Sequence, residues 1–161
     1  MVRAMLIAVL ITIGLQGNAQ TESRITRYNY FFLEAIRQQE MGNLAAAFDL
    51  LNHARDINPK APEVYYEIAG YYVAMQNSKA ARYNFEQAAK LAPDNSTYLE
   101  KLGQFYISQN NYEDALTTYE QLYTSNKTRE DVLQILYQLY GAQNNYKKMI
   151  EMIERMELLS G

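Results

Sequence analysis

Very few side chains in the sequence could carry out covalent or metal chemistry. The 161-residue chain has one histidine, His53, and no cysteine, which excludes thiolate ligands, disulfides and a cysteine nucleophile. Carboxylates occur in pairs, such as Asp49 with Asp56 and Glu151 with Glu154, but basic residues beside both pairs favour solvated, ion-paired helix faces. His53 is likewise expected to face solvent. Because the sequence also has no phosphate-binding loop, GxGxxG, HExxH or GxSxG motif, we expect no enzymatic activity, no metal and no cofactor.

The composition restricts the function classes further. Hydrophobic residues make up 48% of the chain and the formal net charge is −3. Disordered chains have few apolar residues and a high net charge, and nucleic-acid binders normally carry a basic patch, so both classes are excluded. The chain also has 15 tyrosines and 5 phenylalanines. We therefore expect a tyrosine-rich globular protein with very little reactive chemistry.

The structural elements that the sequence predicts repeat every 34 residues. The series with this step include Pro59 and Pro93, Ala47, Ala81 and Ala115, Tyr72, Tyr106 and Tyr140, and Asn43, Asn77, Asn111 and Asn145. They divide the chain into four units, 28–61, 62–95, 96–129 and 130–161. Within each unit the apolar residues have helical spacing on both sides of a tight turn. Each unit is therefore predicted to form two amphipathic helices.

The recurring asparagines lie between the two predicted helices of each unit. There an asparagine side chain can accept a hydrogen bond from an amide at the start of the second helix. The residue before each asparagine is expected to end the first helix in a left-handed conformation, and these residues are Gly42, Gln76, Asn110 and Asn144. Small residues such as Ala69 and Ala81 let the two helices approach closely. Large aromatic residues then fill the space between units.

The repeat pattern resembles the tetratricopeptide repeat family. Unit two matches the family motif completely, with Tyr65, Ile68, Ala69, Tyr72, Ala81, Phe85, Ala88 and Pro93. Unit one departs at Glu34 and Gln38, where Leu and Tyr are usual, unit three has Lys127 in place of the proline, and unit four has Tyr137 at a small position. The resemblance implies an all-α, right-handed solenoid whose first helices line a concave, partner-binding groove.

The family's groove positions, carried over to this sequence, give the candidate binding residues. They are Phe32, Ile36, Gln39, Glu63, Tyr66, Val73, Glu100, Gln104, Gln134 and Gln138, with Gly70 among the same positions. This groove would be apolar and aromatic towards unit one, and polar with acids towards unit four. A basic or amphipathic peptide would suit it, although some of these side chains could instead only cover the groove floor. The family's carboxylate-clamp residues are absent, since Phe32, Ile36 and Glu67 occupy those positions.

The last predicted helix, at about 146–159, carries two apolar faces. A stripe of Tyr146, Ile150 and Ile153 is expected to face the core. A second face consists of Met149, Met152, Met156 and Leu159, and we expect it to dock on another chain, by self-association or otherwise, or on further repeats. In the second case the sequence would be the N-terminal sensor or regulatory portion of a longer polypeptide whose activity lies elsewhere.

The N-terminal residues have the features of a secretory signal peptide. Arg3 precedes an apolar run at 4–15, and small residues at Gly17 and Ala19 suit cleavage before Gln20. The run is too short to span a bilayer, although an uncleaved anchor or a buried helix are alternatives. We expect a signal peptide at 1–19, a short lead at 20–27 and a repeat domain at 28–161. The protein would be exported to a bacterial periplasm or secreted, and without cysteine it would not be a lipoprotein.

Overall fold

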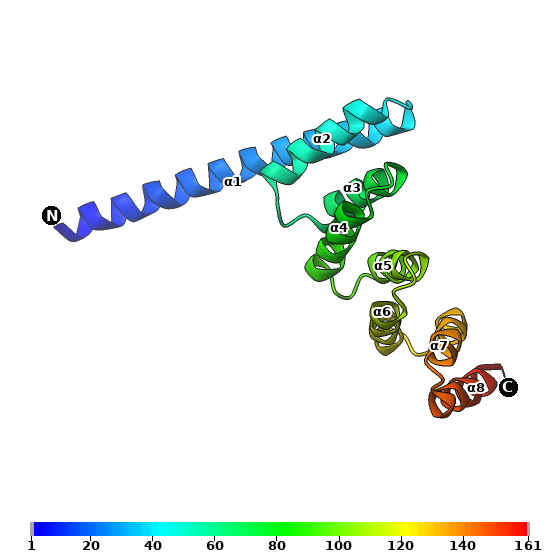
Figure 1. The fold of residues 1–161 in the computed structure, drawn as a ribbon. Coiled ribbons are helices and arrows are strands. Elements are labelled where there is room, and N and C mark those ends of the chain that lie inside the picture. The colour runs from blue at the N-terminus through cyan, green and yellow to red at the C-terminus, as the bar shows by residue number, and fades with distance from the viewer. Residues whose placement is uncertain (1, 161) are drawn as a thin grey trace.

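The structure is a stack of antiparallel helix pairs (Figure 1). The computed structural model describes the backbone of residues 2–160 and the side chains of residues 21–160. The described helices are α1 (Val2–Glu40), α2 (Leu44–Ile57), α3 (Pro62–Ala74), α4 (Ser78–Leu91), α5 (Ser96–Ser108), α6 (Tyr112–Ser125), α7 (Glu130–Ala142) and α8 (Tyr146–Ser160). Each odd-numbered helix packs on the next even-numbered one, and each pair packs on the following pair. The prediction of an all-α solenoid is confirmed.

Left-handed residues and asparagine caps form the turns within the pairs. The backbone φ angle is 80° at Gly42, 56° at Gln76, 58° at Asn110 and 56° at Asn144, as the sequence predicts. The side-chain oxygens of Asn77, Asn111 and Asn145 accept hydrogen bonds from amides at the start of α4, α6 and α8. Asn43 differs, because its amide group donates to Gln38 Oε1 over 2.7 Å and its oxygen does not cap α2.

Close approach within a pair depends on residue size at one position of the first helix. Gly103 on α5 faces Tyr119 of α6, and an added Cβ at Gly103 would lie 2.6 Å from Tyr119 Cε2. Tyr119 is fully buried in the larger of the two core clusters. In unit one the same two positions hold Ala35 and Leu51, both fully buried. A smaller first-helix residue therefore accompanies a larger second-helix residue.

Repeated tyrosine–glutamate hydrogen bonds connect neighbouring pairs. Tyr106 on α5 donates to Glu86 on α4 over 2.8 Å, and Tyr140 on α7 donates to Glu120 on α6 over 2.5 Å. The two bonds are one repeat apart. At the junction of the first two pairs the position of the glutamate holds Asn52, whose amide group donates instead to the carbonyl of its own helix. The sequence analysis did not anticipate these bonds.

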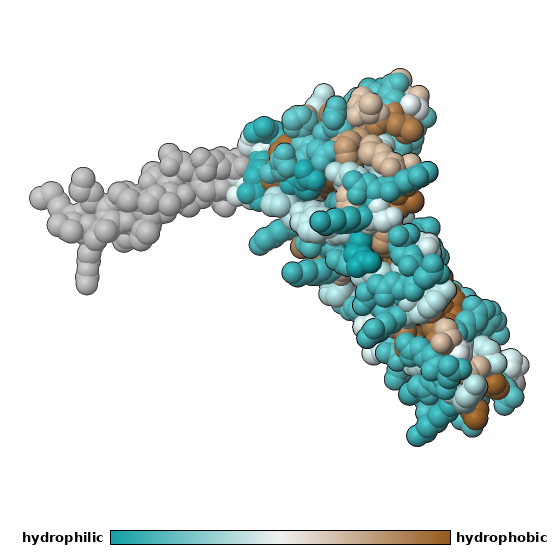
Figure 2. All heavy atoms as spheres, viewed as in Figure 1, coloured by the Kyte–Doolittle hydropathy of each residue, from teal (hydrophilic) through white to brown (hydrophobic). Residues whose placement is uncertain are grey.

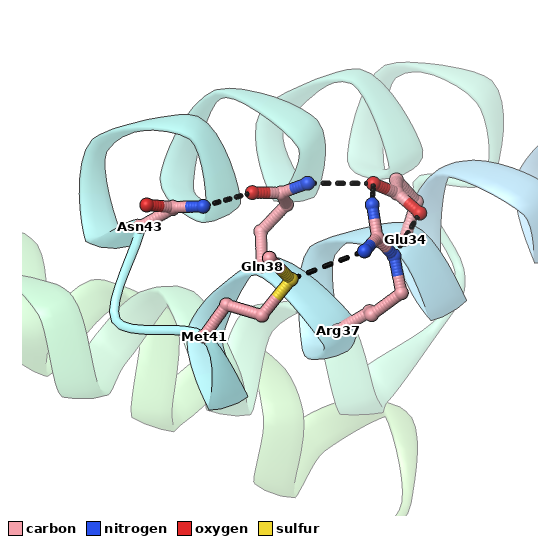
Figure 3. A network of polar contacts seen from close by, with 5 residues as sticks. All are labelled: Glu34, Arg37, Gln38, Met41 and Asn43. Atoms are coloured by element: carbon pink, nitrogen blue, oxygen red, sulfur yellow. Dashed lines mark hydrogen bonds and ion pairs between the residues drawn. The ribbon is translucent and has the colours of Figure 1, made fainter.

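Helix α1 carries a network of polar contacts at its end of the stack (Figure 3). The Glu34 carboxylate accepts hydrogen bonds from Arg37 over 2.5 and 2.8 Å and from Gln38 over 2.7 Å. The Arg37 guanidinium lowers the pKa of Glu34 to about 2, with help from Gln38. Later units have buried leucine or isoleucine where Glu34 stands. The departures of unit one from the family motif therefore place a charged network at this end.

The two faces of α8 are the reverse of the prediction. Met152 is only 6% exposed and belongs to the core cluster, and Met149 and Met156 pack against that cluster. Tyr146, Ile150 and Ile153 are exposed, so the predicted core stripe is wrong. The physical reason is the packing of the last pair: Met149 lies against Gly141 of α7, and Met152 and Met156 pack in the same core cluster. Leu159 remains exposed, as predicted.

Helix α1 continues N-terminally through the predicted lead at 20–27 and projects from the stack (Figure 1). No proline or glycine interrupts residues 20–40, and Thr26 Oγ1 donates to the Glu22 carbonyl within the helix. The side chains of the predicted signal peptide at 1–19 lie outside those that the structure describes. In the described part of the chain, no helix has the length and apolarity needed to cross a membrane.

Candidate binding groove

The first helices α3 and α5 enclose a hollow of about 460 Å³. Its floor is aromatic: the Phe85 and Phe105 ring centroids lie 5.5 Å apart, and Tyr66 meets Phe85 edge to face at 6.3 Å. Gly70 opens the wall on the α3 side, because an added Cβ there would meet no atom within 4 Å. The complete lining is Tyr66, Glu67, Gly70, Val73, Phe85, Lys101, Gln104, Phe105 and Ser108.

A second hollow of about 230 Å³ lies on the other side of α3, against α1. Glu67 and Gly70 line both hollows, so the groove continues across two steps of the stack. Gln39 and Tyr71 form part of the second hollow, where the Tyr71 hydroxyl donates to Gln39 Oε1 over 3.1 Å. The side chain missing at Gly70 therefore makes one continuous groove across the first helices.

The charges of the groove lie on opposite walls. Glu67 on α3 is partly buried, and this burial raises the pKa of its carboxyl above the ordinary value, although a hydrogen bond with Gln39 acts in the opposite direction. Lys101 on α5 is exposed and lines the larger hollow. A carboxylate that has lost part of its hydration gains from a nearby cation. The groove thus combines an apolar floor, an acidic wall on α3 and a basic wall on α5.

Four of the residues predicted from sequence line these hollows. Tyr66, Val73 and Gln104 line the hollow between α3 and α5, and Gln39 lines the hollow between α1 and α3. None of the four is buried, so all are accessible from the groove.

Towards unit one, the predicted groove residues form an aromatic layer between α1 and α3. The ring of Phe32 stacks on Tyr28 with centroids 6.0 Å apart. The Tyr28 hydroxyl donates to the carboxylate of Glu63, and burial is the first cause that raises the pKa of Tyr28. Ile36 is half-buried on α1. The Glu63 carboxylate therefore already accepts one hydrogen bond within the chain, without any partner.

Towards unit four, the predicted acidic character of the groove is reduced. Arg129 forms ion pairs with both Glu100 and Asp131. The hydrogen bonds that Arg129 donates to Asp131 lower the pKa of the Asp131 carboxyl. Sequence analysis did not take this arginine into account. Gln134 and Gln138 are exposed on α7 and line neither of the two groove hollows.

Sequence reasoning did not select Glu67, Lys101, Phe85 and Phe105 as groove residues. Glu67 and Lys101 each follow a predicted groove position by one residue, and helical spacing places Glu67 one turn from Glu63 and Gly70. Phe85 was expected to fill space between units, and it does so while its ring also forms the groove floor. The signal that could have found them is the width of the helix face, which exceeds the single row of motif positions.

A larger hollow of about 730 Å³ lies on the side of the second helices, between α6 and α8. Its charges balance: Lys127, Lys148 and Arg155 line it together with Glu120, Glu151 and Glu154. Glu120 accepts from Tyr140, and Lys148 pairs with Glu151 over 2.8 Å. Within the described residues, no group of three or more His, Asp or Glu side chains could hold a metal ion. The groove on the first helices is therefore the better candidate site.

Comparisons with known proteins agree with the fold. A tetratricopeptide repeat family model matches residues 72–139, and no curated protein matches the sequence. A solved structure described as MamA AMB-1 superposes with a TM-score of 0.69 at 14% identity, covering 83% of this chain and 73% of that one. Another MamA structure gives 0.68 at 15% identity, covering 83% and 78%. A fold of this kind serves as a scaffold for protein binding. The family match identifies residues 72–139 as tetratricopeptide repeats, and the packed helix pairs on both sides of this segment continue the same fold.

Proposed function

We propose that the chain is a non-catalytic interaction module that binds a segment of a partner protein in the groove over Gly70. The observation that carries the proposal is the continuity of the groove across α1, α3 and α5, which the missing side chain at Gly70 creates. The floor offers aromatic surface for an apolar side chain, and such surface carries much of the binding energy in protein interfaces.

The groove chemistry selects a segment with one cation beside an apolar residue. The apolar side chain would lie over Gly70 against Phe105. A lysine or arginine next to it would compensate the partly buried Glu67 carboxylate and lie beside the Tyr66 ring. Lys101 on the opposite wall disfavours a second cation there and attracts a carboxylate or carbonyl oxygen. An acidic segment would meet Glu67 without compensation.

Selection from a random displayed library of 12-residue peptides tests this proposal. The purified chain should enrich peptides with Lys or Arg beside an apolar residue. The selected peptides should bind Glu67→Gln about tenfold more weakly, the range of a lost charged contact. Gly70→Leu should block binding by filling the groove. Gln138→Leu, at an exposed position on α7, is the matched control and should bind like the unmodified chain.

The proposal fails if Gly70→Leu binds the selected peptides as well as the unmodified chain does. It also fails in its charge specificity if acidic peptides are enriched. Circular dichroism of each variant separates lost binding from lost folding.

We also propose export with cleavage between Ala19 and Gln20. The support is the order of Arg3, the apolar run at 4–15 and the small residues before Gln20. Intact mass spectrometry of the protein from the envelope fraction of its host should show an N-terminus at Gln20. A mass that retains residues 1–19 would contradict cleavage and indicate an anchor.

A further inference from the structure

The exposed face of α8 is an apolar surface that the described residues leave uncovered. Tyr146 is 66% exposed, Ile150 56% and Ile153 39%, and helical spacing places all three in one stripe. Figure 2 shows some hydrophobic residues among hydrophilic ones at this end of the molecule, as it does at the end formed by α1 and α2. Met149 and Met156 flank the stripe and are partly buried against the core.

This stripe is built like a contact between units. One repeat earlier, Leu116 and Tyr119 on α6 occupy the positions of Ile150 and Ile153. Tyr119 is buried in the core cluster, with its ring beside Gly103 of α5, and Leu116 packs against the same cluster. Burying Ile150 and Ile153 in the same way would remove large apolar side chains from water, which is favourable.

The opposite end of the stack is mixed in character, because Tyr30, Leu33 and Met41 of α1 are exposed beside charged residues. There Glu34, Arg37 and Gln38 form the charged network of Figure 3. Placing α8 of one copy on this end of another would take an ion pair out of water and set it against isoleucine. Removing charges from water costs several kcal/mol per ion by general estimates. Head-to-tail stacking of copies would carry this cost, whereas a contact between two α8 helices would not.

The charges beside the stripe make α8 complementary to itself. Lys147 and Glu154 are two helical turns apart and lie on the same side of the stripe. Neither forms an ion pair within the described residues, whereas Lys148 and Glu151 pair with each other. If two copies of α8 lie antiparallel, with Ile150 of each against Ile153 of the other, Lys147 of each copy faces Glu154 of the other.

We propose that two copies of the chain associate through α8 as an antiparallel, two-fold symmetric dimer. Such an interface is self-complementary, and it closes without leaving a free end. A contact made by one helix from each copy is smaller than a standard interface of about 1,600 Å², so we expect a dissociation constant of micromolar order. The dimer leaves the groove over Gly70 accessible, and the inference does not depend on the proposed function.

Sedimentation velocity over a concentration series tests the dimer. The mass should rise with concentration from that of one chain, which is 18.6 kDa before the proposed cleavage, towards twice the single-chain value. Ile150→Glu should leave a monomer. Lys147→Glu and Glu154→Lys should each weaken association about tenfold through like-charge contacts, and the double variant should restore it because both pairs are re-formed with reversed charge. Leu33→Glu, at a 65% exposed residue of α1, is the matched control and should dimerise normally.

Several results would overturn the proposal. A monomer at every concentration would mean that α8 is covered by something other than a second copy. Masses that grow beyond the dimer would indicate head-to-tail stacking. A double charge reversal that stays monomeric while folded by circular dichroism would refute the antiparallel register.

Discussion

Replacing Gly103 and Gly70 separately by alanine should change the stability of the protein in opposite directions. Both glycines lie inside helices, where alanine is favoured over glycine by about 0.8–1.0 kcal/mol. At Gly70 an added Cβ meets nothing, so this gain is expected in full. At Gly103 the Cβ would lie 2.6 Å from a ring atom of Tyr119, which is fully buried, so the ring or the two helices would have to shift. Overpacking a core typically costs about 1–3 kcal/mol.

The net expectation is that Gly103→Ala destabilises the fold by about 1 kcal/mol and that Gly70→Ala stabilises it by a similar amount. Urea unfolding followed by far-UV circular dichroism measures both on the same chain. The double variant Gly103→Ala with Tyr119→Leu recreates the pair found in unit one. Its free energy of unfolding should be at least about 1 kcal/mol higher than the value obtained by adding the effects of the two single substitutions.

The reasoning is refuted if Gly103→Ala stabilises the protein as much as Gly70→Ala does. That result would mean that α5 and α6 are farther apart than the structure places them. Additive behaviour of the double variant would contradict the size complementarity between these two positions.

Four further predictions concern turns, junctions and titration. Gln76→Gly should stabilise by about 1 kcal/mol in thermal unfolding, because Gln76 has a φ of 56°, a conformation that glycine adopts without strain. Tyr140→Phe should cost about 1 kcal/mol in urea unfolding, because it removes the 2.5 Å hydrogen bond to Glu120. Burial, and then the glutamate partners, raise the pKa of Tyr106 and Tyr140 above the ordinary value of 10.0, so the folded state holds these protons more tightly than the unfolded chain. The free energy of unfolding should therefore be level near neutral pH and fall above about pH 10, less steeply in the double Phe variant. Binding of a selected cationic peptide should weaken as pH falls through the raised pKa of Glu67, and fluorescence anisotropy should show a flat profile for Glu67→Gln.

The sequence predicts the backbone of this fold well because the repeat supplies the same local signals several times. Asn77, Asn111 and Asn145 cap their helices as expected, and the residues before them adopt the left-handed conformation. Local hydrogen bonding and steric limits determine these features, and the 34-residue spacing makes them visible. Asn43 is the exception, because Gln38, present only in unit one, attracts its side chain.

The site and the ends of the stack are harder to predict, because they depend on contacts between units. The motif positions do not show that Arg129 reaches both Glu100 and Asp131. On α8, both faces are apolar and have helical spacing, so periodicity alone does not distinguish the face that meets α7 from the face that meets the next unit. The structure distinguishes them by burying Met152 and exposing Ile150.

Glycine amide signals offer the most direct test of the groove over Gly70. The chain has 7 glycines, so selective ¹⁵N-glycine labelling gives a simple NMR spectrum. A library-selected peptide is titrated into the labelled chain. The Gly70 signal should shift in proportion to occupancy, whereas the signal of Gly141, which lies on α7 against Met149, should not move. An unchanged Gly70 signal at saturating peptide, with shifts elsewhere, would contradict the account.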